Sequence, residues 1–145
     1  MLIAQISDTH ILVPEAEHPA AELRGDCLRR TVADINKQHP DAVVITGDTV
    51  QHGQPEEYAH LRELLAPLDA PVYLVPGNRD DKNELRAAFG DCPYIAGTGE
   101  FLHYVIDEYD IRLVGIDSTL VGERKGHFCT ARQDWLDGVL GQQPN

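Results

Sequence analysis

Three short clusters of polar residues carry the side chains that could do chemistry in this chain. They read Asp8-Thr9-His10, Gly47-Asp48 and Gly77-Asn78-Arg79-Asp80. The carboxylates of Asp8 and Asp48, the imidazole of His10 and the amide of Asn78 are ligands that suit Mn, Fe, Co, Zn or Mg better than copper or calcium. Asp48 lies in the middle cluster and could bridge two cations. A pair of metal ions roughly 3.5–4 Å apart can hold a bridging hydroxide and neutralise a phosphoryl group, so the clusters predict phosphoester hydrolysis.

Each of these residues also has a purely structural interpretation. An Asp that follows a strand is often a helix cap or a turn former, which applies to Asp8 and to Asp48. Asn78 could simply occupy a left-handed turn after Gly77. The Asp8-x-His10 pair is more specific, because two side chains that diverge from one short turn can chelate one ion. The repetition of such residues along the chain favours the metal site.

Each polar cluster directly follows a short apolar run. Residues 2–6, Ala42–Thr46 and Val72–Val75 are mostly apolar, which is typical of buried strands in a parallel sheet. In an open α/β sheet, ligands bind outside the carboxyl ends of the strands. We therefore expect the three clusters to meet in one crevice.

Helices are predicted between and after these strands. In Ala21–Gln38 apolar residues recur every three or four positions, and Pro40 prevents the helix from continuing. Pro55–Leu65 begins with a Pro and two Glu residues, which helix amino termini favour. A shorter helix is expected over residues 83–89, where a glycine stops it. The resulting β-α-β-α-β order implies right-handed crossovers and a parallel sheet covered on both faces.

Two further elements follow a Gly-rich connection. Residues 101–107 and 111–117 look like the two strands of a hairpin. Thr130 and Gln133 form a predicted capping box for a last helix. Because an α/β protein would normally continue into another strand after this helix, we expect one domain, truncated, over residues 1–145.

The clusters resemble the first three motif blocks of calcineurin-like metallophosphoesterases, as Asp8-x-His10, Gly47-Asp48 and Gly77-Asn78-x-Asp80. Residues 47–58, 75–78 and 115–118 look like the subgroup of class III cyclic-nucleotide phosphodiesterases and glycerophosphodiesterases. The resemblance covers essentially the whole chain. It implies an α/β fold, namely the first half of a four-layer α/β/β/α sandwich, with a mostly parallel sheet followed by a hairpin.

The same resemblance implies a set of site residues and cofactors. Asp8, His10 and Asp48 would bind one metal ion, and Asp48 with Asn78 would bind a second. The two divalent ions would be Mn, Fe, Zn or Co, and the substrate a small phosphoester such as a cyclic nucleotide or a glycerophosphodiester. The expected function is therefore metal-dependent hydrolysis by a binuclear centre.

One residue departs from the family pattern within the third cluster. The family usually has His after Gly-Asn, where it is associated with substrate phosphate and proton handling, and this chain has Arg79. A guanidinium cannot usefully donate a proton near neutral pH, but it can clamp a phosphate through charge-assisted, bidentate hydrogen bonds. We predict that catalytic role for Arg79. The alternative is a surface salt bridge from Arg79 to Asp80 or Asp81.

A larger departure is that the family completes its site with a further metal-binding His and a Gly-His-x-His block, and this chain has neither. His52 and His60 are expected beside or on a surface helix, His103 within a strand and His127 in a loop, so none has ligand spacing. The predicted centre is therefore incomplete unless another chain or a missing carboxyl-terminal half supplies histidines. An exposed apolar sheet face or edge, and self-association into a homo-oligomer, follow from the same expectation.

Composition restricts the partners and the compartment. The net charge is −12, from 24 acidic and 12 basic residues, which argues against a nucleic-acid-binding surface. Three Cys residues without close spacing indicate a reducing cytoplasm rather than a disulfide framework. No export signal or apolar run of about 18 residues is present, so no membrane contact is expected.

Other classes of protein remain as alternatives. The chain could be a non-catalytic fragment that binds a cation or a phosphate and acts by self-association or interaction with other proteins. A nucleotide-binding α/β module is disfavoured because no glycine-rich phosphate loop follows any strand. A haloacid-dehalogenase-like phosphatase would need a second Asp where His10 stands.

Overall fold

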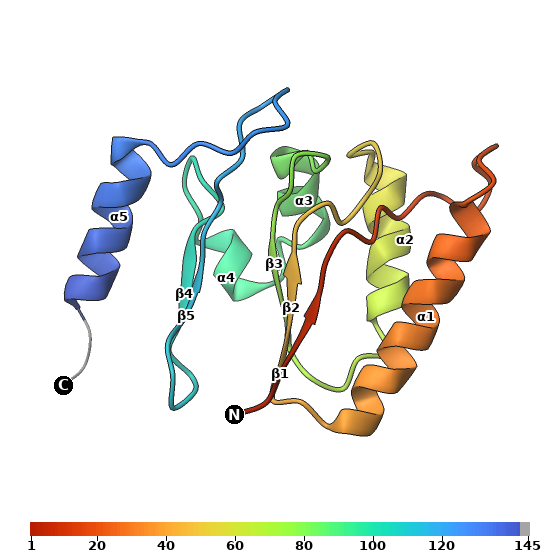
Figure 1. The fold of residues 1–145 in the computed structure, drawn as a ribbon, viewed down its shortest axis with the longest axis horizontal. Coiled ribbons are helices and arrows are strands. Elements are labelled where there is room, and N and C mark those ends of the chain that lie inside the picture. Colours follow the sequence, from red (N-terminus) through yellow and green to blue (C-terminus); the bar gives the residue numbers. More distant parts are fainter. Residues whose placement is uncertain (143–145) are drawn as a thin grey trace.

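Three parallel strands form the centre of the molecule, with helices on one side and a hairpin on the other (Figure 1). The computed structural model describes residues 1–142. In chain order the elements are β1 (Ile3–Ile6), α1 (Ala21–Gln38), β2 (Ala42–Thr46), α2 (Pro55–Leu65), β3 (Val72–Val75), α3 (Lys82–Ala88), α4 (Pro93–Ala96), β4 (Tyr104–Ile106), β5 (Leu113–Gly115) and α5 (Thr130–Gly141).

The parallel sheet has the order β1-β2-β3, and the last residues of neighbouring strands pair with one another. Ile6 of β1 pairs with Ile45 of β2, which in turn pairs with Leu74 of β3. All three strands therefore end at the same edge of the sheet. The loops that follow them must meet there, as predicted.

Helices α1, α2 and α3 cover one face of this sheet and enclose the larger core (Figure 1). Val43, Ile45 and Leu74 point into it from the strands, and Tyr58 and Leu61 point into it from α2. All five side chains are at most 1% exposed. Full burial of a side chain of this size contributes roughly 1.5–3 kcal/mol relative to exposure, so this core fixes the helices on the sheet.

The hairpin β4-β5 packs on the other face of the sheet through tyrosine rings. Tyr73 of β3 lies 6.5 Å from Tyr104 of β4, and Tyr94 lies 4.7 Å from Tyr104. A side chain at Gly115 would overlap the Tyr104 ring, because an added Cβ would lie 2.2 Å from that ring. The small residue therefore lets the aromatic layer close.

Helix α5 lies on the far side of the hairpin (Figure 1). His103 stacks on Trp135 with ring centroids 4.6 Å apart, and Nη1 of Arg112 donates to the carbonyl of Val139 at 2.8 Å. The layers therefore follow one another as helices, parallel sheet, hairpin and a last helix. This arrangement confirms the predicted α/β architecture with a mostly parallel sheet and a hairpin.

Some boundaries differ from the prediction. Helix α3 begins at Lys82 rather than at residue 83, because the Asp81 carboxylate caps it by accepting the N–H groups of Asn83 and Glu84. Helix α4 was not predicted at all, since four residues are too few for a periodic pattern. The hairpin strands are shorter than predicted.

The predicted capping box of the last helix is wrong. Cys129 is the N-cap residue, and its side chain makes no capping hydrogen bond. Thr130 is already helical, and Nε2 of Gln133 donates to the carbonyl of Phe128 instead. A capping box is present instead at the start of α2, where the carboxylate of Glu57 accepts the N–H of Gln54, the N-cap residue.

Candidate metal centre and adjoining cavity

The loops after β1 and β2 run side by side beyond the end of the sheet. The N–H of Asp8 donates to the carbonyl of Gly47 at 3.1 Å, and the N–H of His10 donates to the carbonyl of Asp48 at 2.9 Å. Pairing continues with the N–H of Ile11 and the carbonyl of Thr49 at 3.0 Å. These bonds place the first predicted cluster directly beside the second.

The backbone at these positions is unusual. Asp8, His10 and Asp48 have φ angles of +55°, +46° and +48°. Only one other non-glycine residue among residues 1–142 has positive φ, and that is His39 at the end of α1. A left-handed conformation costs a residue with a Cβ atom roughly 1–2 kcal/mol, and such strain tends to cluster at functional sites.

The left-handed turns bring three potential ligands together. One donor atom each from Asp8, His10 and Asp48 can be chosen so that all lie within 4.8 Å of one another. Nε2 of His10 is 3.8 Å from Oδ1 of Asp8 and 3.8 Å from Oδ2 of Asp48. These distances are too long for hydrogen bonds, whereas they leave room for a cation among the three atoms. The donor set fits a divalent metal ion with nitrogen and oxygen ligands.

The third cluster packs closely against Asp48 at Gly77. An added Cβ at Gly77 would lie 2.1 Å from the backbone nitrogen of Asp48, so no larger residue fits. The N–H of Arg79 donates to Oδ1 of Asp48 at 2.9 Å. Asn78 stands between these two contacts and is exposed. The loop that carries Asn78 therefore lies against Asp48, as predicted from the order of the strands.

Asp80 connects the loops after β2 and β3 through hydrogen bonds to its carboxylate. Its carboxylate accepts the N–H of Gly77 at 2.8 Å, the N–H and hydroxyl of Thr49, the N–H of Val50 and the hydroxyl of Tyr58. Burial raises the pKa of Asp80, although the hydrogen bonds from Thr49 and Gly77 oppose that effect. Asp80 thus ties the loop after β3 to the loop after β2, a role that the sequence did not reveal.

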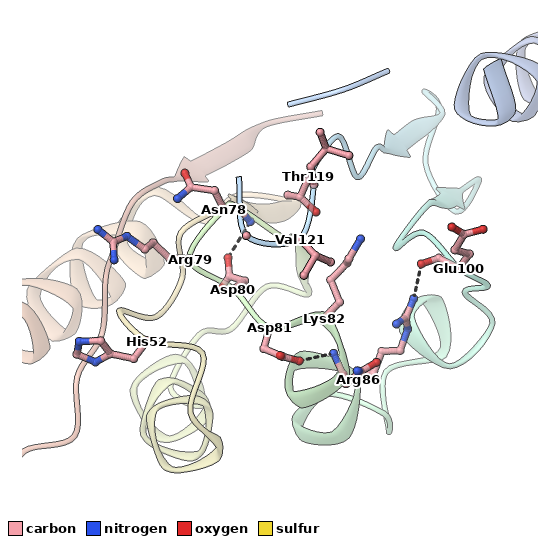
Figure 2. Close-up of a pocket in the computed structure, with 14 residues that line it drawn as sticks. His52, Asn78, Arg79, Asp80, Asp81, Lys82, Arg86, Glu100, Thr119 and Val121 are labelled. Atoms are coloured by element: carbon pink, nitrogen blue, oxygen red, sulfur yellow. Dashed lines mark hydrogen bonds between the residues drawn. The ribbon is translucent and has the colours of Figure 1, made fainter. Parts of the chain in front are cut away.

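A cavity of about 450 Å³ is lined by the third cluster, including Asn78 and the predicted Arg79 (Figure 2). Figure 2 shows Asn78, Arg79 and His52 projecting to the same side, with Lys82 and Thr119 elsewhere around the cavity. The guanidinium of Arg79 forms no ion pair or hydrogen bond with residues 1–142, so the alternative salt bridge to Asp80 or Asp81 is not formed.

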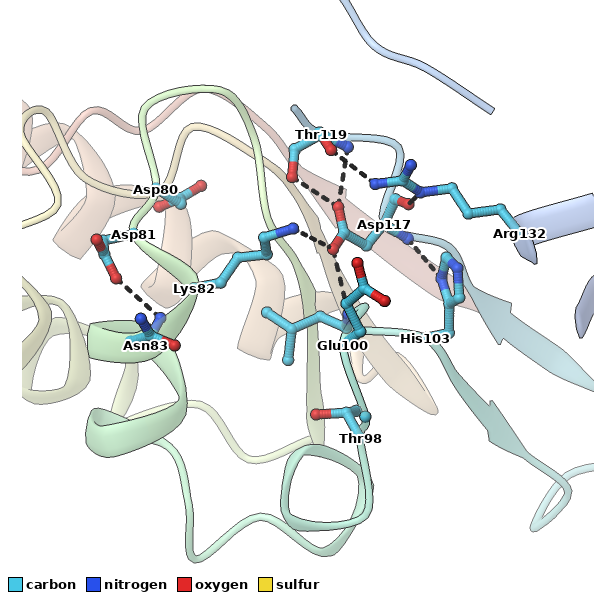
Figure 3. A network of polar contacts seen from close by, with 12 residues as sticks. Asp80, Asp81, Lys82, Asn83, Thr98, Glu100, His103, Asp117, Thr119 and Arg132 are labelled. Carbon is cyan, nitrogen blue, oxygen red and sulfur yellow. Dashed lines mark hydrogen bonds and ion pairs between the residues drawn. The ribbon is translucent and has the colours of Figure 1, made fainter. Parts of the chain in front are cut away.

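A polar network closes the side of the cavity next to the hairpin (Figure 3). Asp117 is fully buried and accepts hydrogen bonds from Nζ of Lys82 at 3.0 Å, the N–H of Leu102 at 3.2 Å and both donors of Thr119. Nε of Arg132 donates to the Asp117 carbonyl at 2.7 Å. Burial opposes ionisation of Asp117, but these hydrogen bonds prevail and lower its pKa.

Three other histidines lie outside the cluster of potential ligands, as predicted, but the burial of His60 was not predicted. His60, expected on a helix surface, is buried, and its Nδ1 lies 2.8 Å from the carbonyl of Leu12. His103 lies just before β4, where Nδ1 accepts the N–H of Asp117 and burial lowers its pKa. His52 is exposed and its Nδ1 lies 2.9 Å from Oε1 of Glu57. None of the three lies in the cluster of potential ligands.

Residues 1–138 match the family model described as calcineurin-like phosphoesterase. This chain belongs to the calcineurin-like phosphoesterase family. It is 36% identical to glycerophosphodiester phosphodiesterase GpdQ of Enterobacter lignolyticus, over 97% of this chain and 51% of that protein. It is 31% identical to a cAMP/cGMP dual specificity phosphodiesterase of Mycobacterium tuberculosis, over 93% of this chain and 43% of that protein.

The fold agrees with this family. A dimetal phosphatase from Danio rerio superposes with a TM-score of 0.67 and 17% sequence identity, over 96% of this chain and 64% of that one. The chain spans about half the length of the curated phosphodiesterases that it matches. Among residues 1–142, no helix is both long enough and apolar enough to cross a membrane.

Proposed function

We propose that this chain carries part of a binuclear metal centre for phosphoester hydrolysis. Asp8, His10 and Asp48 bind one divalent ion, and Asp48 with Asn78 binds a second. The observation that carries this proposal is the convergence of donor atoms from Asp8, His10 and Asp48 within 4.8 Å at the carboxyl ends of two parallel strands. Two such ions, when bound, lower the pKa of water and neutralise charge that develops on a phosphoryl group.

The chain's own groups then orient the reactants. Oδ1 of Asp48 is already held by the N–H of Arg79 at 2.9 Å, which leaves Oδ2 directed toward Nε2 of His10. The guanidinium of Arg79, which has no partner among residues 1–142, lines the cavity, where it can bind two phosphate oxygens. Arg79 therefore binds and orients the phosphate, while proton transfer falls to another group or to water.

The proposed substrate is a small phosphodiester. The two relatives named above act on glycerophosphodiesters and on cyclic nucleotides, and both substrates present one diester to a metal centre. Mn, Fe, Zn or Co each fit a set of carboxylate, imidazole and amide ligands, so cellular supply decides among them. A nucleic acid is a poor substrate for a chain with a net charge of −12.

The four proposed ligands do not fill two coordination shells, since each ion needs at least four donors. We propose that ligands from outside residues 1–145, from a second copy of the chain or from a longer form of the protein, complete the centre. Residues 1–145 then act as one domain within a cytoplasmic homo-oligomer. The alternative, a non-catalytic module that binds one cation or a phosphate, differs in metal stoichiometry and turnover.

The test is metal content together with hydrolysis of bis-p-nitrophenyl phosphate in added Mn²⁺. The proposal predicts two ions per complete site, manganese-dependent turnover, and loss of both in Asp48→Asn. Asp110→Asn, at an exposed position in the hairpin turn, is the matched control and should behave as the unchanged protein. One ion or none, without turnover, would support the non-catalytic alternative instead.

A further inference from the structure

The carbonyl of His10 has a single hydrogen-bond donor among residues 1–142, and this donor comes from helix α1. Nη1 of Arg24 lies 2.9 Å from that oxygen. The same nitrogen lies 2.7 Å from Oε1 of Gln51, three residues after Asp48. Arg24 therefore joins the loop that carries His10 to the loop that carries Asp48.

Arg24 is well placed to hold both loops. It lies in the first turn of α1, where its own N–H donates to the carbonyl of Ala20 at 2.9 Å. Ala21 and Leu28 of the same helix are buried, at 3% exposed each, so the helix is fixed on the core. A partly buried guanidinium on a rigid helix can set the position of a flexible loop.

His10 depends on such a contact more than an ordinary residue would. Its φ of +46° is unfavourable for a residue with a Cβ atom. Its N–H is held by the carbonyl of Asp48 at 2.9 Å, and its carbonyl is held by Arg24. Without Arg24 the carbonyl loses its partner, and the peptide can relax toward a conformation that turns the imidazole away from Asp8 and Asp48.

We infer that Arg24 is a positioning residue, which fixes the backbone of His10 and so directs its imidazole at the metal position. The inference rests on the proposed function, because metal binding is what this positioning serves. Arg24 donates to a carbonyl and to the Gln51 amide, so it acts through other residues. Loss of such an outer partner weakens metal affinity by about 10–100-fold in metalloproteins.

Three substitutions on α1 test the inference. Arg24→Met removes both hydrogen bonds and keeps a long side chain that favours helix. Arg24→Lys keeps one nitrogen donor, which can serve both acceptors because a single nitrogen serves both in the structure. Arg30→Met makes the same change at an exposed position of the helix, where the side chain has no hydrogen bond with residues 1–142, and is the matched control.

Two measurements are needed, one on the metal-free protein and one with added Mn²⁺. NMR of the metal-free protein should show shifted backbone and imidazole signals of His10 in R24M, recovered in R24K and unchanged in R30M. Calorimetric titration with Mn²⁺ alone should show about tenfold weaker binding in R24M, at least partial recovery in R24K and no change in R30M.

Wild-type His10 signals and wild-type Mn²⁺ affinity in R24M would overturn the inference, and so would an equal loss in R24K or R30M. If R24M does not fold, Gln51→Leu replaces it, since that change removes only one of the two acceptors and should give a smaller loss than tenfold. Wild-type protein that binds no Mn²⁺ would contradict the proposed function. The His10 signals of the metal-free variants would still decide the role of Arg24.

Discussion

The donor atoms of the proposed centre are brought together by local backbone geometry. Asp8, His10 and Asp48 all adopt the left-handed conformation that side chains with a Cβ atom avoid, at a cost of roughly 1–2 kcal/mol each. The hydrogen bonds between the two loops and the buried residues that follow them, Ile11 and Val50, offset this cost. The loops are therefore held in shape before any ligand binds, which reduces the cost of ordering on binding.

Gly77 is the residue whose substitution tests this packing most simply. Gly77→Ala should lower the free energy of unfolding by about 1–3 kcal/mol, because its Cβ would lie 2.1 Å from the backbone nitrogen of Asp48. It should also weaken Mn²⁺ binding, because Asp48 must move. Urea denaturation and calorimetric titration measure the two effects.

Gly138→Ala in α5 is the control for that substitution. Apart from the helix's own backbone and the two adjacent residues, no atom within the described range 1–142 lies within 4 Å of a Cβ added at Gly138, so the change should stabilise the helix by up to about 1 kcal/mol. If G77A were as stable as G138A and bound Mn²⁺ equally well, the close packing of the third loop on Asp48 would be wrong.

Among the elements, a partly buried lysine and a fully buried aspartate form an ion pair that connects the two layers of strands. Lys82 begins α3 on the parallel sheet, and Asp117 follows β5 of the hairpin; their charged atoms are 3.0 Å apart. Lys82→Met should cost about 3–5 kcal/mol of unfolding free energy, because it leaves the Asp117 carboxylate buried without its cation. Lys37→Met, which breaks an exposed pair with Asp34, should cost less than about 1 kcal/mol in the same denaturation assay. Equal losses in the two variants would contradict this role of Lys82.

The hydrogen bonds that Asp117 accepts also predict a dependence of stability on pH. Burial acts to raise the pKa of Asp117, but hydrogen bonds from Thr119 and Lys82 outweigh burial. They hold the pKa in the folded protein below the ordinary value of 3.8. A lowered carboxyl pKa contributes stability above the unfolded pKa, and that contribution is lost as pH falls through the folded pKa. The stability difference between wild type and Asp117→Asn should therefore be largest near pH 7 and shrink below about pH 4. A difference that stays constant from pH 7 to pH 3 would contradict it.

Most elements could be predicted from the sequence because their signals are local. Runs of Val and Ile mark the strands, Pro55 marks the start of α2, and Ala21–Gln38 has a clear helical period. The convergence of Asp8, His10 and Asp48 also followed from the order of the strands, and the cluster confirms it.

Long-range contacts could not be predicted in this way. Nothing near Asp80 or Arg24 in the sequence shows that each bonds a loop from another part of the chain. His60 looks like a surface residue on α2, yet it is buried against the carbonyl of Leu12, 48 residues away. Thr130 and Gln133 satisfied a local capping pattern, but the helix begins one residue earlier than that pattern requires, with Cys129 as its N-cap.

In the molecule as a whole, β1 lies at an edge of the parallel sheet, and within residues 1–142 it pairs with no strand other than β2. Ile3 is 37% exposed, and Leu2 and Met1 beside it are 52% and 48% exposed. Edge strands with apolar side chains tend to associate with strands of other chains. We predict that sedimentation of the 145-residue chain will show a dimer or larger species, and a compact monomer at all concentrations would contradict the proposed homo-oligomer.

The most direct test of the metal centre is anomalous X-ray diffraction from crystals grown with Mn²⁺. We predict a manganese peak among Asp8, His10 and Asp48, at about 2.0–2.2 Å from one donor atom of each. A second peak should lie on the Asn78 side of Asp48. The absence of any peak at Asp8, His10 and Asp48 in the presence of saturating Mn²⁺, or a peak bound elsewhere, would contradict the assignment of these residues as metal ligands.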